Sequence, residues 1–183
     1  KTKMKVEKAS GLKRALFVDR DNTLTYDTGY TFRLDDFAWK PGAIEGLKAF
    51  SEAEFLLFII TNQSGIGRGF FTEKDMHFFH ERLCIEAANA GAPISDIAFC
   101  PHHPKAVIPE LQGPCACRKP EPGMILQLAE KWHIDCSQSV VIGDKQSDLA
   151  AGHRAGCHSY LLEDEARLDK LAARLLLIHG TAT

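Results

Sequence analysis

Residues 15–23 read Ala-Leu-Phe-Val-Asp-Arg-Asp-Asn-Thr. The first four form a short apolar run, which is typical of a fully buried β-strand. Asp19 and Asp21 follow directly, so that two carboxylates stand at the carboxyl end of that strand. Open α/β sheets bind their ligands just outside the carboxyl ends of their strands. An Asp-x-Asp pair in this place also serves as a helix cap, a turn or a cation site, and the rest of the chain must decide between these interpretations.

The composition is that of an ordinary globular protein, with 183 residues, of which 45% are hydrophobic and 25% charged. The net charge is −2 and no basic run indicates a nucleic-acid partner. The apolar runs at 55–60 and 175–178 are too short to cross a membrane. Residues 1–13 are basic but lack the apolar core of a secretion signal. We expect a lead-in at 1–13 and one domain at 14–183, in a cytoplasmic monomer without nucleic-acid or membrane partners.

Apolar strand candidates alternate with helical patterns along the chain. The strands are expected at 15–18, 55–61, 96–100, 139–143 and 157–161, and the helices at 42–53, 73–90, 122–133, 146–155 and 164–173. This alternation favours an α/β fold, a Rossmann-like parallel sheet with helices on both faces. Residues 26–39 are expected to form a small hairpin or flap. His77 and His80 have no partner in the sequence pattern and are expected on the surface of their helix.

Polar residues also follow the second strand candidate and precede the third helix candidate. Thr61 ends the second apolar run, and the turn Asn62-Gln63-Ser64-Gly65-Ile66-Gly67 follows it. A hydroxyl and the backbone N–H groups of such a turn can cradle phosphate oxygens, although the same residues also simply end strands. Arg118 and Lys119 stand just before a helix N-terminus, which favours anions.

The fourth strand candidate ends in Asp144, followed by Lys145 and, one helical turn later, by Asp148. Carboxylates of this kind are hard oxygen ligands that suit Mg²⁺. Asp148 would orient Lys145 or a metal-bound water, or act as a helix cap. The carboxyl ends of parallel strands meet at one edge of a sheet. Asp19, Thr61, the loop that carries Lys119 and Asp144 are therefore predicted to form a single site.

A separate cluster stands in the proline-rich stretch 101–121, which is too long for an unsupported loop. Cys100-x-His102 is followed, after twelve residues, by Cys115-x-Cys117. Three thiolates and an imidazole suit a structural Zn²⁺, and a full protein ligand set leaves no position for catalysis. His103 is an alternative ligand to His102, and a disulfide or free thiols are the alternative to a metal. A zinc ion here would hold the loop and so position Arg118 and Lys119.

The order of these motifs resembles the haloacid dehalogenase-like (HAD-like) phosphatases. The residues that carry it are Asp19-x-Asp21-x-Thr23, Thr61, Lys119 and Asp144-x-x-x-Asp148. More narrowly, the chain resembles the D-glycero-D-manno-heptose 1,7-bisphosphate 7-phosphatases over about residues 14–160. The matching segments are Asp19-Arg-Asp21, Thr61-Asn-Gln-Ser-Gly-Ile66, Cys100-Pro-His-His-Pro104, Cys115-x-Cys117-Arg-Lys-Pro120 and Gly143-Asp-Lys145.

The resemblance implies a Mg²⁺-dependent phosphatase with an aspartyl-phosphate intermediate and without a large cap domain. Asp19 would be the nucleophile and Asp21 the proton donor. The expected phosphoryl stabilisers are Thr61, Arg118 and Lys119. The expected Mg²⁺ ligands are Asp19, the backbone carbonyl of Asp21, and Asp144. The expected Zn²⁺ ligands are Cys100, His102, Cys115 and Cys117. The sugar phosphate would contact Asp27, Thr28, Gly29, Tyr30, Asn62, Gln63, Ser64 and Lys145.

One position departs from the family, which usually has Gly where this chain has Asn22. If a positive φ is required there, Asn is the best non-glycine substitute. A histidinol-phosphate phosphatase is the alternative enzyme, while a zinc-loop binding module and a catalytically silent scaffold are alternatives of another class. The twelve-residue spacer and the run Lys119–Met124 favour the heptose enzyme. The near-neutral charge argues against a nucleic-acid module, and the filled catalytic positions argue against a silent scaffold.

Overall fold

The computed structural model describes residues 11–181, in which five parallel strands form one sheet in the order β3-β2-β1-β4-β5. The strands are β1 (Ala15–Val18), β2 (Leu56–Asn62), β3 (Ile94–Cys100), β4 (Val140–Gly143) and β5 (His158–Leu161). The predicted α/β fold is therefore confirmed, with strand ends shifted by at most two residues. Most of the expected lead-in lies outside the described residues, and Lys13 already pairs with Ile134 in an isolated bridge.

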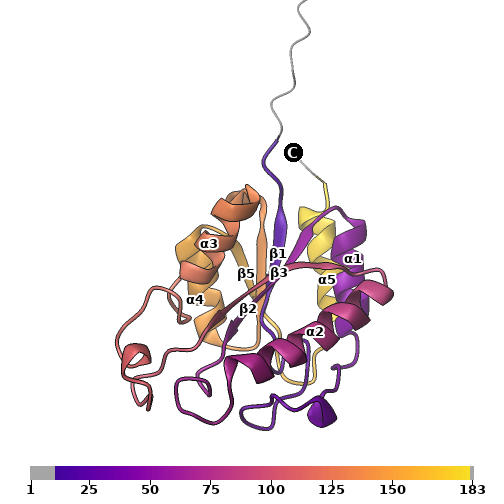
Figure 1. Ribbon diagram of the computed structural model, residues 1–183. Helices are drawn as coiled ribbons and strands as arrows, with labels where there is room; N and C mark the ends of the chain where they lie inside the picture. Colours follow the sequence, from indigo (N-terminus) through magenta and orange to yellow (C-terminus); the bar gives the residue numbers. More distant parts are fainter. Residues whose placement is uncertain (1–10, 182–183) are drawn as a thin grey trace, which may run out of the picture.

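The helices are α1 (Ala43–Glu52), α2 (Glu73–Asn89), α3 (Gly123–Trp132), α4 (Gln146–Ala155) and α5 (Leu168–His179). Because successive strand residues point to opposite faces, β1 contributes to two cores. Leu16 and Val18 pack with α1, α2 and α5, whereas Ala15 and Phe17 pack with α3 and α4. Figure 1 shows α3 and α4 on one side of the sheet and α1 and α5 on the other. The expected helices on both faces are thus confirmed.

The last helix differs from the prediction of 164–173, because α5 begins at Leu168 and ends at His179. Glu165 has a φ of 65°, which a helix cannot accommodate. The buried residues of α5 are Leu168, Leu171, Ala172 and Leu175, a helical stripe that packs on α1. A Cβ at Gly46 of α1 would lie 2.6 Å from Cγ of Leu168, so only glycine permits this close approach.

The strand order brings the ends of β1 and β4 together. The chain runs outward from β1 through β2 to β3, and β4 then pairs with the other side of β1. Such a reversal leaves a crevice at the carboxyl ends of the two strands, where open α/β sheets bind ligands. Asp19 and Asp144, the first residues after β1 and β4, therefore lie at this crevice.

Two connections project at this end of the sheet. Residues 26–39, expected as a small hairpin or flap, lie in the first connection, and an antiparallel bridge between Thr25 and Trp39 closes them. Residues 101–122 contain the short 3₁₀ turn Pro109–Leu111 and the Cys/His cluster. The described chain accordingly has no large cap domain, as expected. Within residues 11–181, no helix has the length and apolar character to traverse a bilayer.

Candidate active site

Asp19 lies at the end of β1 beside a buried lysine. Nζ of Lys119 donates to Oδ1 of Asp19 at 2.7 Å and to the carbonyl of Ile60 at 2.9 Å. The same ammonium lies 2.6 Å from Oδ1 of Asp148. Burial alone would lower the pKa of Lys119, but the carboxylates of Asp19 and Asp148 outweigh it and hold the pKa above its ordinary value. Lys119 is therefore charged and fixed against Asp19.

Asp148 was predicted either to orient Lys145 or a metal-bound water, or to cap a helix. Its Oδ2 accepts the backbone N–H of Lys145 at 3.0 Å, which is a cap of α4. Its other oxygen binds Lys119, a contact that the sequence pattern did not predict. A Cβ at Gly143 would lie 2.2 Å from Oδ2 of Asp148, so the glycine that ends β4 makes room for this carboxylate.

Asp144 completes a group of three carboxylates with Asp19 and Asp148, whose ligand oxygens lie within 4.8 Å of one another. Oδ1 of Asp144 is buried and has no hydrogen-bond partner among the described residues. Burial, and then the neighbouring Asp19 carboxylate, raise the pKa of Asp144 to about 7. An orphaned oxygen in a crowded acidic site fits a hard divalent cation such as Mg²⁺. Lys119 pairs with both Asp19 and Asp148, but the second oxygen of Asp148 is also occupied by the N–H of Lys145. Asp144, with its unpartnered oxygen, and Asp19 are therefore the carboxylates best placed to hold the ion.

Asp21 lies on the same loop as Asp19, with both oxygens engaged. Oδ1 accepts from Nε of Arg20 at 2.8 Å, and Oδ2 accepts from Nε2 of Gln63 at 3.0 Å. Burial raises the pKa of Asp21 above its ordinary value, Arg20 opposes the shift, and the carboxylate of Asp19 adds to it. A raised pKa suits a carboxyl group that must donate a proton near neutral pH.

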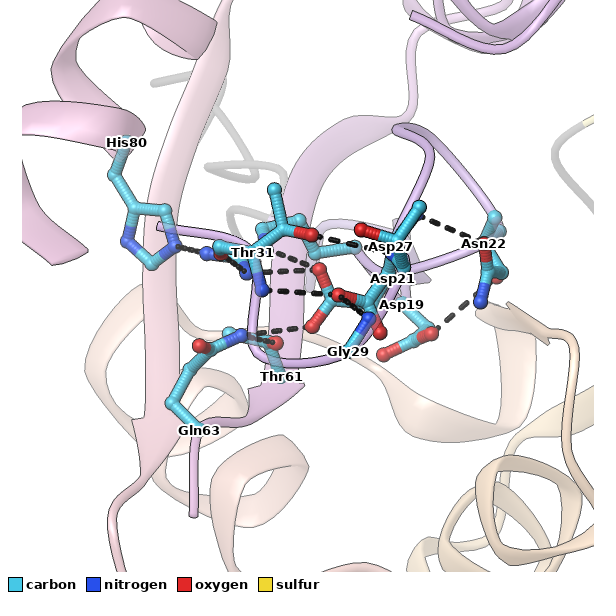
Figure 2. Close-up of polar contacts among 12 residues, drawn as sticks. Asp19, Asp21, Asn22, Asp27, Gly29, Thr31, Thr61, Gln63 and His80 are labelled. Atoms are coloured by element: carbon cyan, nitrogen blue, oxygen red, sulfur yellow. Dashed lines mark hydrogen bonds and ion pairs between the residues drawn. The ribbon is translucent and has the colours of Figure 1, made fainter. Parts of the chain in front are cut away.

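The end of β2 supplies the residues that connect these groups (Figure 2). Nε2 of Gln63 also donates to Oγ1 of the fully buried Thr61 at 2.7 Å. Asn62 holds the backbone of Lys119 at both ends, because its Nδ2 donates to the carbonyl at 3.2 Å and its Oδ1 accepts the N–H at 3.1 Å. Gln63 and Asn62, which were expected to contact substrate, thus also hold catalytic candidates in place.

A cleft of about 530 Å³ opens beside these groups. The predicted catalytic residues that line it are Asp21, Arg118 and Lys119. The predicted substrate contacts that line it are Asp27, Gly29, Tyr30, Asn62, Gln63, Ser64 and Lys145. Thr28 is the one predicted contact that does not line it, although it lies within the same turn. The structure therefore brings nearly all of the predicted substrate contacts to one cleft.

The turn that carries Asp27 to Tyr30 is tied to the catalytic loop. Asn22 has a φ of 59°, as expected for a residue in the place of glycine. Its Oδ1 accepts the backbone N–H of Asp27 at 3.0 Å, a bond that a glycine cannot make. Oδ1 of Asp27 in turn accepts the N–H groups of Gly29 and Thr31, at 3.2 and 3.0 Å. Asn22 thus adds a side-chain contact to this turn.

The Cys/His cluster forms as predicted, since the ligand atoms of Cys100, His102, Cys115 and Cys117 lie within 4.8 Å of one another. Sγ of Cys100 lies 3.6 Å from Sγ of Cys115 and 3.5 Å from Nδ1 of His102. Burial raises the pKa of the Cys100 thiol, so that a bound cation is needed to stabilise its thiolate. These two separations suit a tetrahedral ion with Zn–S bonds of about 2.3 Å, whereas Sγ of Cys117 lies closer, 2.9 Å from Sγ of Cys100.

The cluster is joined to the cleft through Arg118. The backbone N–H of Arg118 lies 3.4 Å from Sγ of Cys115, and its Nη1 donates to the carbonyl of His102 at 3.1 Å. His103 lies outside the four-residue cluster, and its Nδ1 accepts the N–H of Lys105 at 3.0 Å. The geometry therefore favours His102 as the ligand.

Two residues near the site were not predicted. Arg20 is fully buried beside Asp21, and Nη1 of Arg20 lies 3.0 Å from Nε2 of His80. The expectation that His80 lies on the helix surface is wrong, because its side chain is only 5% exposed and faces Arg20. His77 is exposed, as expected. The signal in the sequence was Met76-x-x-Phe79-His80, in which His80 continues the buried face of α2.

The chain is similar to known proteins over most of its length. The HAD-hydrolase-like family model matches residues 116–174. The D-glycero-beta-D-manno-heptose-1,7-bisphosphate 7-phosphatase of Rhodopseudomonas palustris is 40% identical over 82% of this chain and 84% of that protein. The D-glycero-alpha-D-manno-heptose-1,7-bisphosphate 7-phosphatase of Photorhabdus laumondii is 40% identical over 78% of each chain.

Among solved structures, the chain is similar to the D,D-heptose 1,7-bisphosphate phosphatase of B. bronchiseptica in complex with magnesium and phosphate. The TM-score is 0.77 at 27% identity, over 90% of this chain and 99% of the other. The similarity therefore extends over nearly the whole fold.

Proposed function

The chain belongs to the HAD-like heptose 1,7-bisphosphate 7-phosphatases, and we propose that it removes the 7-phosphate of D-glycero-D-manno-heptose 1,7-bisphosphate. One observation carries the proposal. Asp19 stands at the end of β1 with the ammonium of Lys119 at 2.7 Å, and Asp144 faces it from β4. This is the arrangement that a carboxylate nucleophile needs to attack a phosphoryl group.

In the proposed reaction the carboxylate of Asp19 attacks phosphorus, and Asp21 protonates the leaving sugar oxygen. Asp21, now a carboxylate, then takes a proton from the water that cleaves the aspartyl-phosphate. Lys119, Arg118 and Thr61 bind the equatorial oxygens, where negative charge accumulates. Bound Mg²⁺, held by Asp19, the carbonyl of Asp21 and Asp144, would neutralise further charge on the phosphoryl group.

The Cys100–His102–Cys115–Cys117 cluster is proposed to hold a structural Zn²⁺ rather than a catalytic one, because protein ligands fill all four positions. We place the enzyme in the cytoplasm, where thiols of this kind stay reduced. We further propose a single domain over residues 14–183 that acts as a monomer, since all of the proposed site residues come from one chain.

The test is phosphate release with Mg²⁺ from both anomers of heptose 1,7-bisphosphate and from histidinol phosphate. We expect a strong preference for one heptose anomer, and we expect Asp19→Asn and Asp19→Ala to reduce turnover to background. Relatives named for either anomer are equally similar, so the assay must decide between the anomers. A preference for histidinol phosphate would show that histidinol phosphate, not the heptose bisphosphate, is the substrate. A near-wild-type rate in Asp19→Asn would overturn the proposed mechanism.

A further inference from the structure

Arg20 is the largest of the fully buried side chains, although it stands between two acidic residues of the active-site loop. Each nitrogen of its guanidinium has a partner. Nε and Nη2 both lie 2.8 Å from Oδ1 of Asp21, and Nη2 also donates to the carbonyl of Thr31 at 2.9 Å. Nη1 lies 3.0 Å from Nε2 of His80. A buried guanidinium group whose three nitrogens all have hydrogen-bond partners has a fixed position and orientation.

Helix α2 provides the support for Arg20. Phe79 lies beneath the guanidinium, with the Cζ atom of Arg20 4.6 Å from the ring centroid. Burial, and then the charge of Arg20, lower the pKa of His80 to about 3, so that its imidazole is neutral. A neutral Nε2 without a proton accepts the hydrogen of Nη1. His80 thus holds one end of the guanidinium while Asp21 binds the other.

The consequence for Asp21 is that its two oxygens are not equivalent. Oδ1 receives two donors from Arg20, which disfavours a proton there. Oδ2 receives only the amide of Gln63, at 3.0 Å, and a protonated Oδ2 can still accept that bond. Gln63 also binds Thr61, so Oδ2 is the oxygen on the side of the proposed phosphoryl site. In Figure 2, His80 lies at one end of this network, and Gln63 and Thr61 approach Asp21 from below.

We propose that Arg20, held by His80, is a positioning residue that directs the catalytic proton of Asp21 to Oδ2. The inference rests on the proposed phosphatase function and deepens it. As the bond between phosphorus and the leaving oxygen breaks, the proton on Oδ2 moves to that oxygen, and Asp21 is left as a carboxylate. Through the carbonyl of Thr31, the same guanidinium also ties Asp21 to the turn that lines the cleft.

The test is the dependence of kcat/KM on the leaving group, which reports the step that Asp21 assists as an acid. The probes are aryl phosphates with increasingly basic leaving groups, assayed with Mg²⁺. A leaving group of low basicity departs without protonation, whereas a basic one needs the acid. A general loss of structure would reduce the rates for all leaving groups alike. The slope of kcat/KM against leaving-group basicity therefore distinguishes a positioning role from an effect on folding.

The variants are His80→Leu, His80→Gln and Arg20→Lys, with His77→Leu as the matched control on the exposed face of α2. His80→Leu removes the acceptor, whereas the glutamine amide restores one at a similar reach. Arg20→Lys keeps the charge, but one ammonium cannot bind Asp21, His80 and Thr31 together. Far-ultraviolet circular dichroism is used to check that each variant is folded. If one variant is unfolded, the inference is tested with the remaining folded variants.

We expect His80→Leu and Arg20→Lys to lose about 10- to 100-fold in kcat/KM for the most basic leaving group and less than about threefold for the least basic. His80→Gln should return the slope toward wild type. An equal loss of kcat/KM across the series, or an unchanged slope in both variants, would overturn this inference and leave the proposed function standing. Absence of phosphate release by the wild-type protein from every aryl and sugar phosphate would overturn the proposed function and the inference with it.

Discussion

At the scale of single residues, buried His80 makes the stability of the fold depend on pH. Burial and the charge of Arg20 lower its pKa from 6.5 to about 3. Above pH 6.5 the imidazole is neutral in both the folded and the unfolded chain. As the pH falls from 6.5 toward 3, the unfolded chain takes up a proton that the folded chain refuses. The free energy of unfolding therefore decreases as the pH is lowered through this range, by at most about 1.4 kcal/mol per pH unit from this group.

His80→Gln is expected to remove this part of the pH dependence while keeping an acceptor for Arg20. The measurement is urea unfolding of the wild type and the variant at several pH values below 6.5. The difference between the two free energies should change steadily as the pH falls. His77→Gln removes an exposed imidazole on the same helix whose charge also opposes protonation of His80, and it should change the pH dependence much less than His80→Gln does. Parallel curves for His80→Gln and the wild type would show that the imidazole does not titrate in this way.

Asp19, Thr61 and Asp144 were predictable from sequence because each stands at the end of an apolar strand, and strand ends meet at one edge. The burial of Arg20 was not predictable, because a charged residue between two carboxylates has the pattern of a solvated loop. Its burial depends on His80, which is 60 residues away on another element. Likewise, the contact between Asp148 and Lys119 joins distant parts of the chain that no local pattern relates.

At the scale of elements, the loop between β3 and α3 is expected to depend on zinc. Arg118 binds Cys115 through its backbone N–H and His102 through its guanidinium, so that loss of the ion would release an arginine that lines the cleft. Strong chelation should remove about one zinc per chain and lower activity about 10- to 100-fold, since small displacements at a catalytic site have effects of this size. Added Mg²⁺ should not compensate.

The matched variants for this prediction are His102→Ala and His103→Ala. The first removes a predicted ligand and should abolish zinc in the purified protein, as measured by atomic absorption. The second changes a neighbour outside the cluster and should leave the zinc content unchanged. Full activity in protein that contains no zinc would refute a structural role for the ion.

The helices and strands followed largely from periodicity and end signals. Thr72 and Asp75 form a capping box at the start of α2, in which Oγ1 of Thr72 accepts the N–H of Asp75 at 3.1 Å. The start of α5 was wrong, because residues 164–167 have the charged composition of a first helical turn. Its true position is set by the packing of Leu168 against Gly46, a tertiary contact that local composition does not reveal.

At the scale of the whole molecule, alternation predicted a parallel sheet but could not give its order. The order β3-β2-β1-β4-β5 depends on which strand pairs with the free edge of β1, and apolar runs of similar length fit either edge. Only the pairing of β1 with β4, in which Val18 lies opposite Ile142, brings Asp19 beside Asp144. The site was therefore predictable as a set of residues, whereas its geometry required the fold.

Lys13 and Arg14 join the start of β1 to distant parts of the described fold. The N–H of Lys13 donates to the carbonyl of His133 at 3.0 Å, and the carbonyl of Lys13 accepts from Asp135 at 2.7 Å. Arg14 then joins the start of β1 to the ends of α1 and α5, because its guanidinium donates to the carbonyls of Ala53, His179 and Gly180.

Arg14→Ala is therefore expected to destabilise the whole fold, because it breaks three hydrogen bonds from a charged donor. It should lower the free energy of unfolding by at least about 2 kcal/mol, since hydrogen bonds to charged groups contribute about 1.5–3 kcal/mol each. The three carbonyls do not belong to the residues that line the cleft, so kcat of the folded variant should be unchanged. Calorimetry and phosphate release, applied to the variant and the wild type, test both expectations. An unchanged Tm would show that these contacts do not hold the start of β1 in place.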